Sequence, residues 1–232
     1  MQVIITGGSK GIGKATAELF AAQGHDIFLC ARGEMALYKT MEALQTRFPA
    51  VQIKAKPVDM SQKKEAIAFA EWCLATAVPD IVVNNAGLFE PGSVADEADG
   101  NLESQIQTNL YSAYHFTRTL LPKMKEKKSG HIFTLCSVAS LKAYHNGGAY
   151  SISKFALRGF TMNLREELKP YGIKVTALYP GSAMTDSWKG FDNTEKRIME
   201  ADDVAKMIVA CTTLSPQACV EELVIRPQLG DL

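Results

Sequence analysis

Three side chains near the middle of the chain have the types and spacing needed for proton transfer: Ser137, Tyr150 and Lys154. Tyr150 and Lys154 are four residues apart, so on a helix both side chains lie on the same face. A free phenol has a pKa of about 10 and is a poor acid–base group at neutral pH. A nearby ammonium group favours the phenolate and lowers the phenol pKa towards the working range. The pair therefore predicts a tyrosine that exchanges a proton with a bound substrate.

Ser137 supplies the third group of this predicted site. It stands at the end of the apolar run His131–Ser137, which we predict to be a strand. Open parallel sheets bind their ligands at the carboxyl ends of the strands. A hydroxyl at that place is suited to hold a substrate carbonyl oxygen on which negative charge develops. A single serine, tyrosine or lysine carries little weight, so the prediction depends on their joint placement.

The elements that must position these groups follow from the alternation of apolar patterns. Short β-branched runs, several of them apolar at consecutive positions, are typical of strands that helices bury on both faces. The predicted strands are Gln2–Thr6, Asp26–Ala31, Val51–Val58, Asp80–Asn84, His131–Ser137, Lys174–Tyr179 and Glu221–Arg226. The predicted helices are Gly11–Gln23, Met35–Phe48, Lys63–Thr76, Leu102–Lys127, Tyr150–Tyr171 and Ala201–Thr213. We therefore expect an α/β fold in one domain, residues 1–232, with a doubly wound parallel sheet of seven strands (a Rossmann fold).

Composition excludes several classes of protein. The 232 residues include 25 Lys+Arg and 25 Asp+Glu, so the formal net charge is zero and gives no footprint for nucleic acid or an anionic membrane. The five cysteines are an odd number with no C-x-x-C pair, which indicates neither a disulfide framework nor a zinc site. No run has the length of a membrane-spanning helix, and the start of the chain has no signal-peptide pattern. We expect a cytoplasmic protein without a metal.

A glycine-rich turn, Thr6–Gly13, joins the first predicted strand to the first helix. Glycines in such a turn let the backbone approach a pyrophosphate, and the helix N-terminus offers unpaired N–H groups. The spacing G-x-x-x-G-x-G differs from the G-x-G-x-x-G fingerprint, and the turn alone is equally suited to close a βα unit. Its place in the first βα unit favours a nucleotide.

The residue after the second predicted strand indicates which nucleotide. An NAD site of this type places Asp or Glu there for the ribose 2′-hydroxyl. This chain has Arg32, and Lys10 adds a second positive charge in the glycine turn. A guanidinium pairs bidentately with a phosphate. Arg32 is otherwise an ordinary surface residue after a strand, but the two cations together predict NADP(H).

Several segments in this order make the chain resemble the short-chain dehydrogenases/reductases over nearly its whole length. The segments are TGGSKGIG, Val58-Asp59, NNAG at Asn84–Gly87, Asn109 in TNLYSAY, Ser137 with Y-x-x-x-K, and P-G-x-x-x-T at 180–185. The resemblance implies Asn109, Ser137, Tyr150 and Lys154 as the catalytic residues. It implies, with the charges above, cofactor contacts from Gly7, Ser9, Lys10, Gly11, Ile12, Gly13, Arg32, Asp59, Asn85, Ala86, Gly87, Tyr150, Lys154, Pro180, Gly181 and Thr185.

The family resemblance also implies roles for the catalytic residues. Tyr150 donates a proton to a carbonyl while hydride arrives from the nicotinamide, and Lys154 lowers the phenol pKa. Lys154 also passes protons to a water held by the main-chain carbonyl of Asn109, where the resemblance implies a kink in the helix. Two departures from the family pattern stand out. Cys136 replaces a serine before Ser137, where a buried thiol is the simpler interpretation than a redox role. Ala183 replaces a branched residue of the nicotinamide segment.

Substrate contacts are expected from Ser137, Tyr144, Tyr150, Met184 and Trp188, with a substrate lid near 182–195. Within the family, the segment around the Y-x-x-x-K pair, the Trp188 region and the C-terminal tail resemble bacterial sepiapterin-reductase-like members. That suggests a pterin side-chain carbonyl, a diketone or a similar small molecule. The alternatives are a 3-oxoacyl thioester reductase and an NADP(H)-binding sensor without chemistry. The resemblance further implies a homodimer or homotetramer.

Overall fold

The computed structural model describes residues 1–185, 188 and 190–231. These residues form a seven-stranded sheet in the order β3-β2-β1-β4-β5-β6-β7, and every neighbouring pair is parallel. The strands are β1 (Gln2–Thr6), β2 (Asp26–Ala31), β3 (Ile53–Pro57), β4 (Ile81–Asn84), β5 (Gly130–Leu135), β6 (Ile173–Pro180) and β7 (Glu222–Ile225). The predicted doubly wound parallel sheet in one domain is confirmed.

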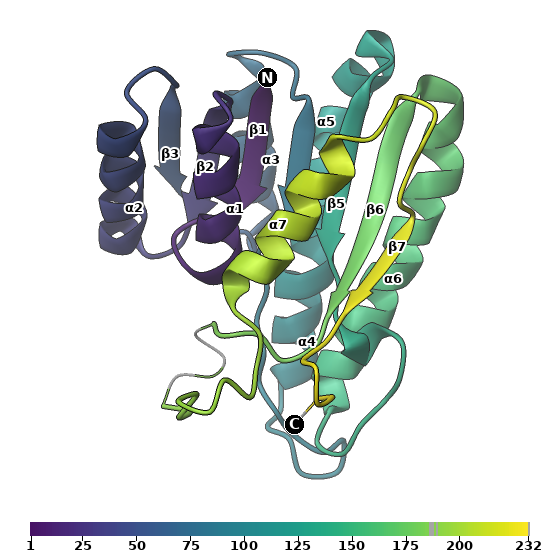
Figure 1. The fold of residues 1–232 in the computed structure, drawn as a ribbon. Coiled ribbons are helices and arrows are strands. Elements are labelled where there is room, and N and C mark those ends of the chain that lie inside the picture. Colours follow the sequence, from purple (N-terminus) through teal and green to yellow (C-terminus); the bar gives the residue numbers. More distant parts are fainter. Residues whose placement is uncertain (186–187, 189, 232) are drawn as a thin grey trace.

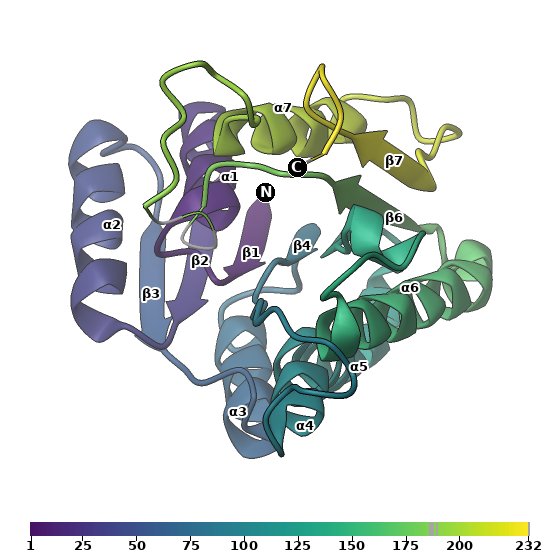
Figure 2. The same ribbon diagram turned by 90° about the horizontal axis from the view of Figure 1, so that it is seen from below.

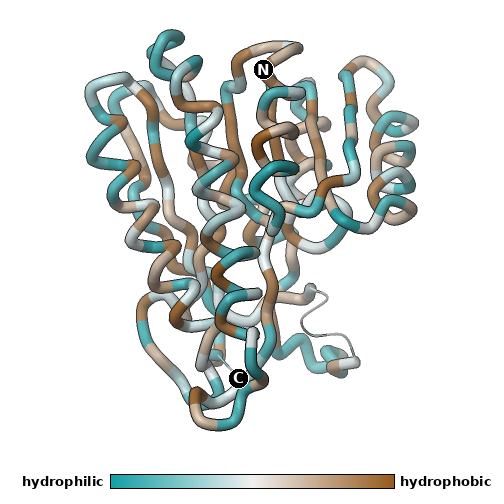
Figure 3. Tube along the Cα trace, turned by 180° about the vertical axis from the view of Figure 1, so that it is seen from behind, coloured by the Kyte–Doolittle hydropathy of each residue, from teal (hydrophilic) through white to brown (hydrophobic). Residues whose placement is uncertain are grey.

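Helices cover both faces of this sheet, as the view along the strands in Figure 2 shows. One layer holds α1 (Gly11–Ala22), α2 (Glu34–Arg47) and α7 (Ala201–Thr212). The other holds α3 (Lys63–Leu74), α4 (Asn101–Ile106), α5 (Ser112–Lys127) and α6 (Gly148–Leu168). Within β1, Val3 and Ile5 pack in the core of the first layer and Ile4 in that of the second. Apolar residues therefore line the strands and the inner helix faces, and polar ones the outside (Figure 3).

The carboxyl ends of all strands meet at one edge of the sheet, at the bottom of Figure 1. The strand order reverses between β1 and β4, whose successors in sequence run to opposite sides. That reversal is where open parallel sheets bind ligands. The long loops after β4, β5 and β6 lie at this edge, together with the C-terminal tail (Figure 1). The fold thus gathers the predicted site residues from distant parts of the chain.

Two predicted elements are wrong in their continuity or length. The predicted helix Leu102–Lys127 is interrupted by a π-helical turn, Gln107–Tyr111, which separates α4 from α5. The predicted strand His131–Ser137 ends at Leu135, and Ser137 instead begins a 3₁₀ turn. The other boundaries agree to within two residues, except that the helix predicted to end at Tyr171 ends at Leu168 and is followed by a 3₁₀ turn, Lys169–Tyr171. No helix in the described part of the chain is long and apolar enough to span a bilayer.

Candidate active site

Tyr150 and Lys154 stand on the first turns of α6, on the face turned towards the sheet. The Lys154 side chain is buried and its Nζ donates to the carbonyl oxygen of Leu135 at 2.8 Å, at the end of β5. Nζ lies 5.8 Å from the centre of the Tyr150 ring. Burial lowers the pKa of Lys154 to about 8. The predicted pair is therefore assembled, with an ammonium group poised to give up its proton near neutral pH.

The phenol of Tyr150 departs from the expected electrostatics. Burial raises the pKa of Tyr150 above its ordinary value, and a hydrogen bond from the Ser137 hydroxyl partly opposes this rise. The pKa of Tyr150 is therefore raised, and the predicted lowering of this pKa is wrong. The Phe89 ring packs edge-on against Tyr150, 4.8 Å between centroids, and helps to exclude water. Tyr150 thus begins as a neutral phenol, which is the form that donates a proton.

Ser137 lies next to Tyr150 because the chain turns sharply after β5. Its Oγ accepts from the backbone N–H of Ala139 at 3.1 Å, and its own N–H donates to Ser140 Oγ at 3.2 Å. This reciprocal capping box fixes the serine at the start of the 3₁₀ turn. The hydroxyl hydrogen is left to point at the phenol or at a ligand. The neighbouring Cys136 is buried, and burial raises the pKa of its thiol to about 11, in keeping with a structural role.

Asn109 sits in the middle of the π-helical turn between α4 and α5. Its Oδ1 accepts from the N–H of Leu88 at 2.7 Å, and its Nδ2 donates to the carbonyl of Leu88 and to Ser153 Oγ. The side chain therefore joins the segment after β4 to α6. A π turn also breaks the regular i→i−4 ladder, which is how a helix presents a main-chain carbonyl to another partner. The family resemblance implied a kink in the helix at Asn109, and the structure has a π turn there.

The glycine turn is shaped by contacts that admit no side chain. Gly7 and Gly11 have positive φ values of 68° and 51°. A methyl group added to Gly13 would overlap the carbonyl oxygen of Gly7. No side chain caps the N-terminus of α1, and its first turn has no acidic residue. The first-turn N–H groups of α1, including that of Ile12, are thus suited to bind an anion.

Thr6 is a central residue of this turn that the sequence analysis did not identify. Its Oγ1 donates to the carbonyl of Val83 and accepts from the N–H groups of Asn85 and Ala86, each at 3.0 Å. In turn, Asn85 Nδ2 donates hydrogen bonds to the carbonyl oxygens of Thr6 and Gly7. The hydroxyl therefore locks the end of β1 to the segment that follows β4.

Replacing Thr6 by valine is expected to lower the free energy of unfolding by about 2–4 kcal/mol, because two N–H groups lose their acceptor at nearly constant volume. Urea denaturation followed by circular dichroism measures this loss. Thr213→Val is the control, since that exposed threonine bonds only the last turn of α7 and is expected to change stability by less than about 0.5 kcal/mol. Equal stability of the two variants would contradict the role of the Thr6 hydroxyl in joining the end of β1 to the segment after β4.

The predicted phosphate-binding cations lie together at the carboxyl edge of β1 and β2. Lys10 is the N-cap of α1, and Arg32 directly follows β2; both are exposed. Ser9 of the same turn is held by Thr40, whose hydroxyl donates to its carbonyl. Asp59 follows β3 and accepts from the N–H and hydroxyl of Ser61, so its carboxylate shapes the turn before α3.

The segment after β6 closes over the glycine turn. Thr185 lies against Gly11, where an added methyl group would sit 3.2 Å from Thr185 Cγ2. Pro180 ends β6, and the Gly181 N–H donates to the carbonyl of Ile225 at 2.8 Å. A side chain on Gly181 would overlap the carboxylate of Asp231, so the C-terminal tail packs directly on this segment. The sequence analysis did not assign the tail to the site.

Of the residues predicted to contact the substrate, Tyr144 lies near Tyr150, and Met184 and Trp188 make their contacts within the segment that follows β6. Tyr144 is 45 % exposed, yet partial burial raises the pKa of its phenol to about 12, with Tyr150 close enough to add to the rise. The Met184 N–H donates to the carbonyl of Met199, and Trp188 packs edge-on against Phe191 at 5.2 Å. Part of the predicted lid, residues 186, 187 and 189, lies outside the described residues. Gly87 backs the site near Asn109 Oδ1 and Lys154 Nζ.

Comparison with known proteins agrees with this arrangement. Residues 1–196 match the family described as short chain dehydrogenase. A sepiapterin reductase of Chlorobaculum tepidum is 30% identical over 239 residues, covering 99% of this chain and 97% of its own. An uncharacterised oxidoreductase of Staphylococcus epidermidis is 30% identical over 224 residues, with 97% and 96% covered.

Two solved structures share the whole fold. An alcohol dehydrogenase from the archaeon Thermococcus sibiricus, complexed with 5-hydroxy-NADP, has a TM-score of 0.90 at 25% identity and covers 98% of this chain and 96% of its own. A metagenomic short-chain oxidoreductase in complex with NADP has a TM-score of 0.85 at 28% identity, with 98% and 97% covered. The chain belongs to the short-chain dehydrogenase family and is an oxidoreductase of that family.

Proposed function

We propose that this oxidoreductase uses NADPH to reduce the carbonyl group of a small molecule, with Tyr150 as general acid. The observation that carries the proposal is the cluster of Ser137, Tyr150 and buried Lys154 beside a glycine turn, at the point where the strand order reverses. A proton donor and an anion-binding turn at one edge of the sheet are the two parts that reduction by a nicotinamide nucleotide requires.

The residues present fit NADP(H). The uncapped first turn of α1 and the tight glycine backbone suit the pyrophosphate, and exposed Lys10 and Arg32 suit a 2′-phosphate. Asp59 and the segment Asn85–Gly87 would hold the adenosine and its ribose, and Pro180–Thr185 would contact the nicotinamide. When bound, NADPH supplies the hydride. Both solved relatives described above contain an NADP-type nucleotide.

The side chains of this protein supply the proton and the polar contacts. The hydroxyls of Ser137 and Tyr150 point at one location, where they bind a carbonyl oxygen and stabilise its developing negative charge. Tyr150, a neutral phenol because burial raises its pKa, then donates its proton to that oxygen. The ammonium group of Lys154, with its pKa of about 8, stabilises the phenolate that forms and returns a proton. The π turn at Asn109 offers a carbonyl for a water that connects Lys154 to solvent.

For the substrate we propose a pterin side-chain carbonyl, a diketone or a similar small ketone. The similarity to a sepiapterin reductase and the aromatic rings of Phe89, Tyr144 and Trp188 support a flat, partly apolar ligand. The loop bordering the site opposes the alternative of a 3-oxoacyl thioester. The loop between β4 and α4, residues 85–100, includes four acidic side chains and no lysine or arginine. This loop repels the negative charge of a coenzyme A or acidic carrier-protein thioester.

The proposal is tested by following NADPH oxidation with sepiapterin, diacetyl, aromatic aldehydes and 3-oxoacyl thioesters. Turnover of sepiapterin or diacetyl is the expected result. Turnover confined to thioesters would favour that alternative despite the acidic loop. Binding of NADPH without turnover of any compound would favour a sensor, although the intact catalytic cluster argues against it.

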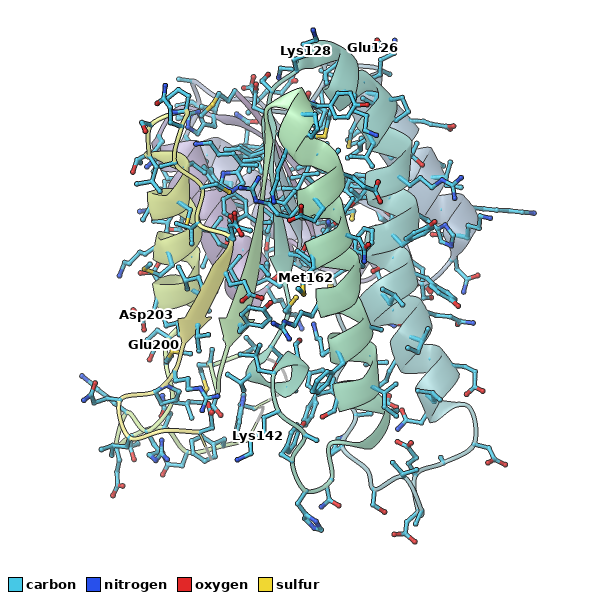
Figure 4. The ribbon with its side chains drawn as sticks, turned by 90° about the vertical axis from the view of Figure 1, so that its right-hand side faces the viewer. Glu126, Lys128, Lys142, Met162, Glu200 and Asp203 are labelled. Carbon is cyan, nitrogen blue, oxygen red and sulfur yellow. The ribbon has the colours of Figure 1, made fainter. Side chains whose placement is uncertain are left out.

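We further propose that the enzyme is a cytoplasmic homodimer or homotetramer. Exposed apolar side chains gather on the outer faces of the π turn, α5 and α6, and one of them, Met162, is labelled in Figure 4. The others are Tyr111, Tyr114, Ile152 and Phe155, between 37% and 48% exposed. Exposed apolar side chains on neighbouring helices are typical of subunit interfaces. Size-exclusion chromatography with light scattering measures the molar mass of the assembly. A molar mass equal to that of one chain would contradict the proposed homo-oligomer.

A further inference from the structure

We propose that Glu97 is a positioning residue that fixes the first turn of α6, and with it Tyr150, against the loop that borders the substrate. Glu97 lies in this loop, between β4 and α4, and no role was assigned to it from sequence. Its Oε2 accepts from the backbone N–H of Ala149 at 3.2 Å, directly before Tyr150. The same oxygen accepts from Asn101 Nδ2 at 2.9 Å. One carboxylate thus holds the catalytic helix and α4 together.

A buried polar chain anchors Glu97 from the other side. Asn101 Oδ1 accepts from Gln105 Nε2 at 3.1 Å, and Gln105 also donates to the carbonyl of Glu90 at 3.0 Å. Asn101 and Gln105 are both buried on α4. The chain runs from the loop through α4 and back to the start of α6, so Glu97 has little freedom to move. Buried networks of this kind hold a single geometry.

The loop and the helix start also touch through backbone alone. The Gly92 N–H donates to the carbonyl of Asn146 at 3.0 Å. A methyl group on Gly148 would overlap the carbonyl oxygen of Gly92 and would lie 2.9 Å from Glu97 Oε2. Gly148, with φ of 22°, is the first residue of α6. The helix therefore begins pressed against the loop, in a place that only glycine fits.

The same loop carries groups that meet the reacting centre. Leu88 is held at both backbone atoms by Asn109, and Phe89 packs on the Tyr150 ring. Glu97 connects the far end of this loop to Ala149, the residue that precedes Tyr150. A carboxylate at a helix N-terminus is also favoured by the helix dipole. Loss of Glu97 is expected to free the first turn and to misplace the phenol.

The inference rests on the proposed function for its effect on turnover, so the test has a second readout that needs no substrate. The variants are Glu97→Ala and Glu97→Gln, whose amide oxygen retains the acceptor. Asp99→Asn is the matched control, because it removes an exposed carboxylate from the same loop. Hydrogen exchange of the peptide covering residues 146–153 reports the first turn of α6. Steady-state kinetics reports kcat and the KM for NADPH.

Glu97→Ala is expected to speed amide exchange in this peptide by about tenfold, with exchange in β1 and β5 unchanged. It is expected to lower kcat by about 10- to 100-fold with KM for NADPH unchanged, since displacement of the proton donor affects the reaction more than cofactor binding. Glu97→Gln is expected to keep both the amide exchange rate of this peptide and kcat close to the values of the unmodified protein.

Unchanged exchange and unchanged kcat in Glu97→Ala would overturn the inference, as would equal losses in Glu97→Gln or in Asp99→Asn. A parallel rise in the KM for NADPH, or faster exchange in β1 and β5, would replace it with a general loss of structure. If the unmodified protein reduces no carbonyl, the proposed function fails, and the exchange data alone then decide whether Glu97 fixes the helix start.

Discussion

Replacing Tyr150 by phenylalanine is expected to lower kcat by about 100- to 10,000-fold, the range supplied by a positioned general acid. The ring would keep its packing on Phe89, and only the hydroxyl shared with Ser137 would be lost. Binding of NADPH, measured by fluorescence titration, is expected to stay within about tenfold, because at most one hydrogen bond to the nucleotide disappears. The loss therefore falls on the chemical step.

Tyr171→Phe is the control for this substitution. Tyr171 follows α6 at its other end and is 37% exposed, far along the helix from the site. Its ring contact with Lys125 survives in phenylalanine. If Tyr150→Phe retained turnover close to that of Tyr171→Phe with any good substrate, another group would have to be the proton donor.

The second large effect is expected at the cofactor. Arg32→Asp is expected to lower the ratio of kcat/KM for NADPH to kcat/KM for NADH by at least about 100-fold. A charge-assisted pair with the 2′-phosphate contributes about 1.5–3 kcal/mol, and a carboxylate at the same place adds repulsion of similar size. Each 1.36 kcal/mol corresponds to about tenfold in the ratio. The carboxylate is also able to accept from the free 2′-hydroxyl of NADH.

Lys39→Glu makes the same change of charge on an exposed position of α2, close in sequence to Arg32. It is expected to leave the cofactor ratio within about threefold, because an exposed charge away from the phosphate is screened by salt. If Arg32→Asp had the same ratio of kcat/KM for NADPH to kcat/KM for NADH as Lys39→Glu, the 2′-phosphate would have to be recognised by other residues. Lys10 would be the next residue to change.

The sheet and the shared helix face of Tyr150 and Lys154 were predictable because both depend on local patterns. Continuous apolar runs such as Val3–Ile5 bury both faces of a strand, and the structure packs alternate residues of that run in different cores. The i, i+4 spacing of Tyr150 and Lys154 placed both on one face of α6. The glycine turn and Arg32 were predictable for the same reason, since each lies within a few residues of a strand end.

Features that depend on contacts between distant segments were not predictable. The π turn at Asn109 arises where the side chain bonds Leu88, and nothing in the local periodicity marks it. The raised pKa of Tyr150 reflects burial by Phe89 and its surroundings, which overrides the expected effect of Lys154. Ser137 left the predicted strand because its hydroxyl caps a 3₁₀ turn.

The C-terminal tail is a further example of this limit. Arg197, after the predicted lid, donates to the carbonyl of Gly230 at 2.8 Å, and Arg226 pairs with Asp231 at 3.1 Å. These contacts bring the last residues onto Gly181. The sequence showed a resemblance in this tail, but a contact over such a separation follows only from the folded chain.

Transfer of deuterium from NADPH that carries deuterium at both C4 positions of the nicotinamide tests the central claim most directly. The purified protein is incubated with the labelled cofactor and the carbonyl compound that it turns over fastest, and the product is analysed by mass spectrometry. The predicted result is an alcohol with one deuterium on the former carbonyl carbon, formed by the unmodified protein and not by Tyr150→Phe. A protein that binds NADPH but transfers no deuterium to any of the compounds would contradict the account.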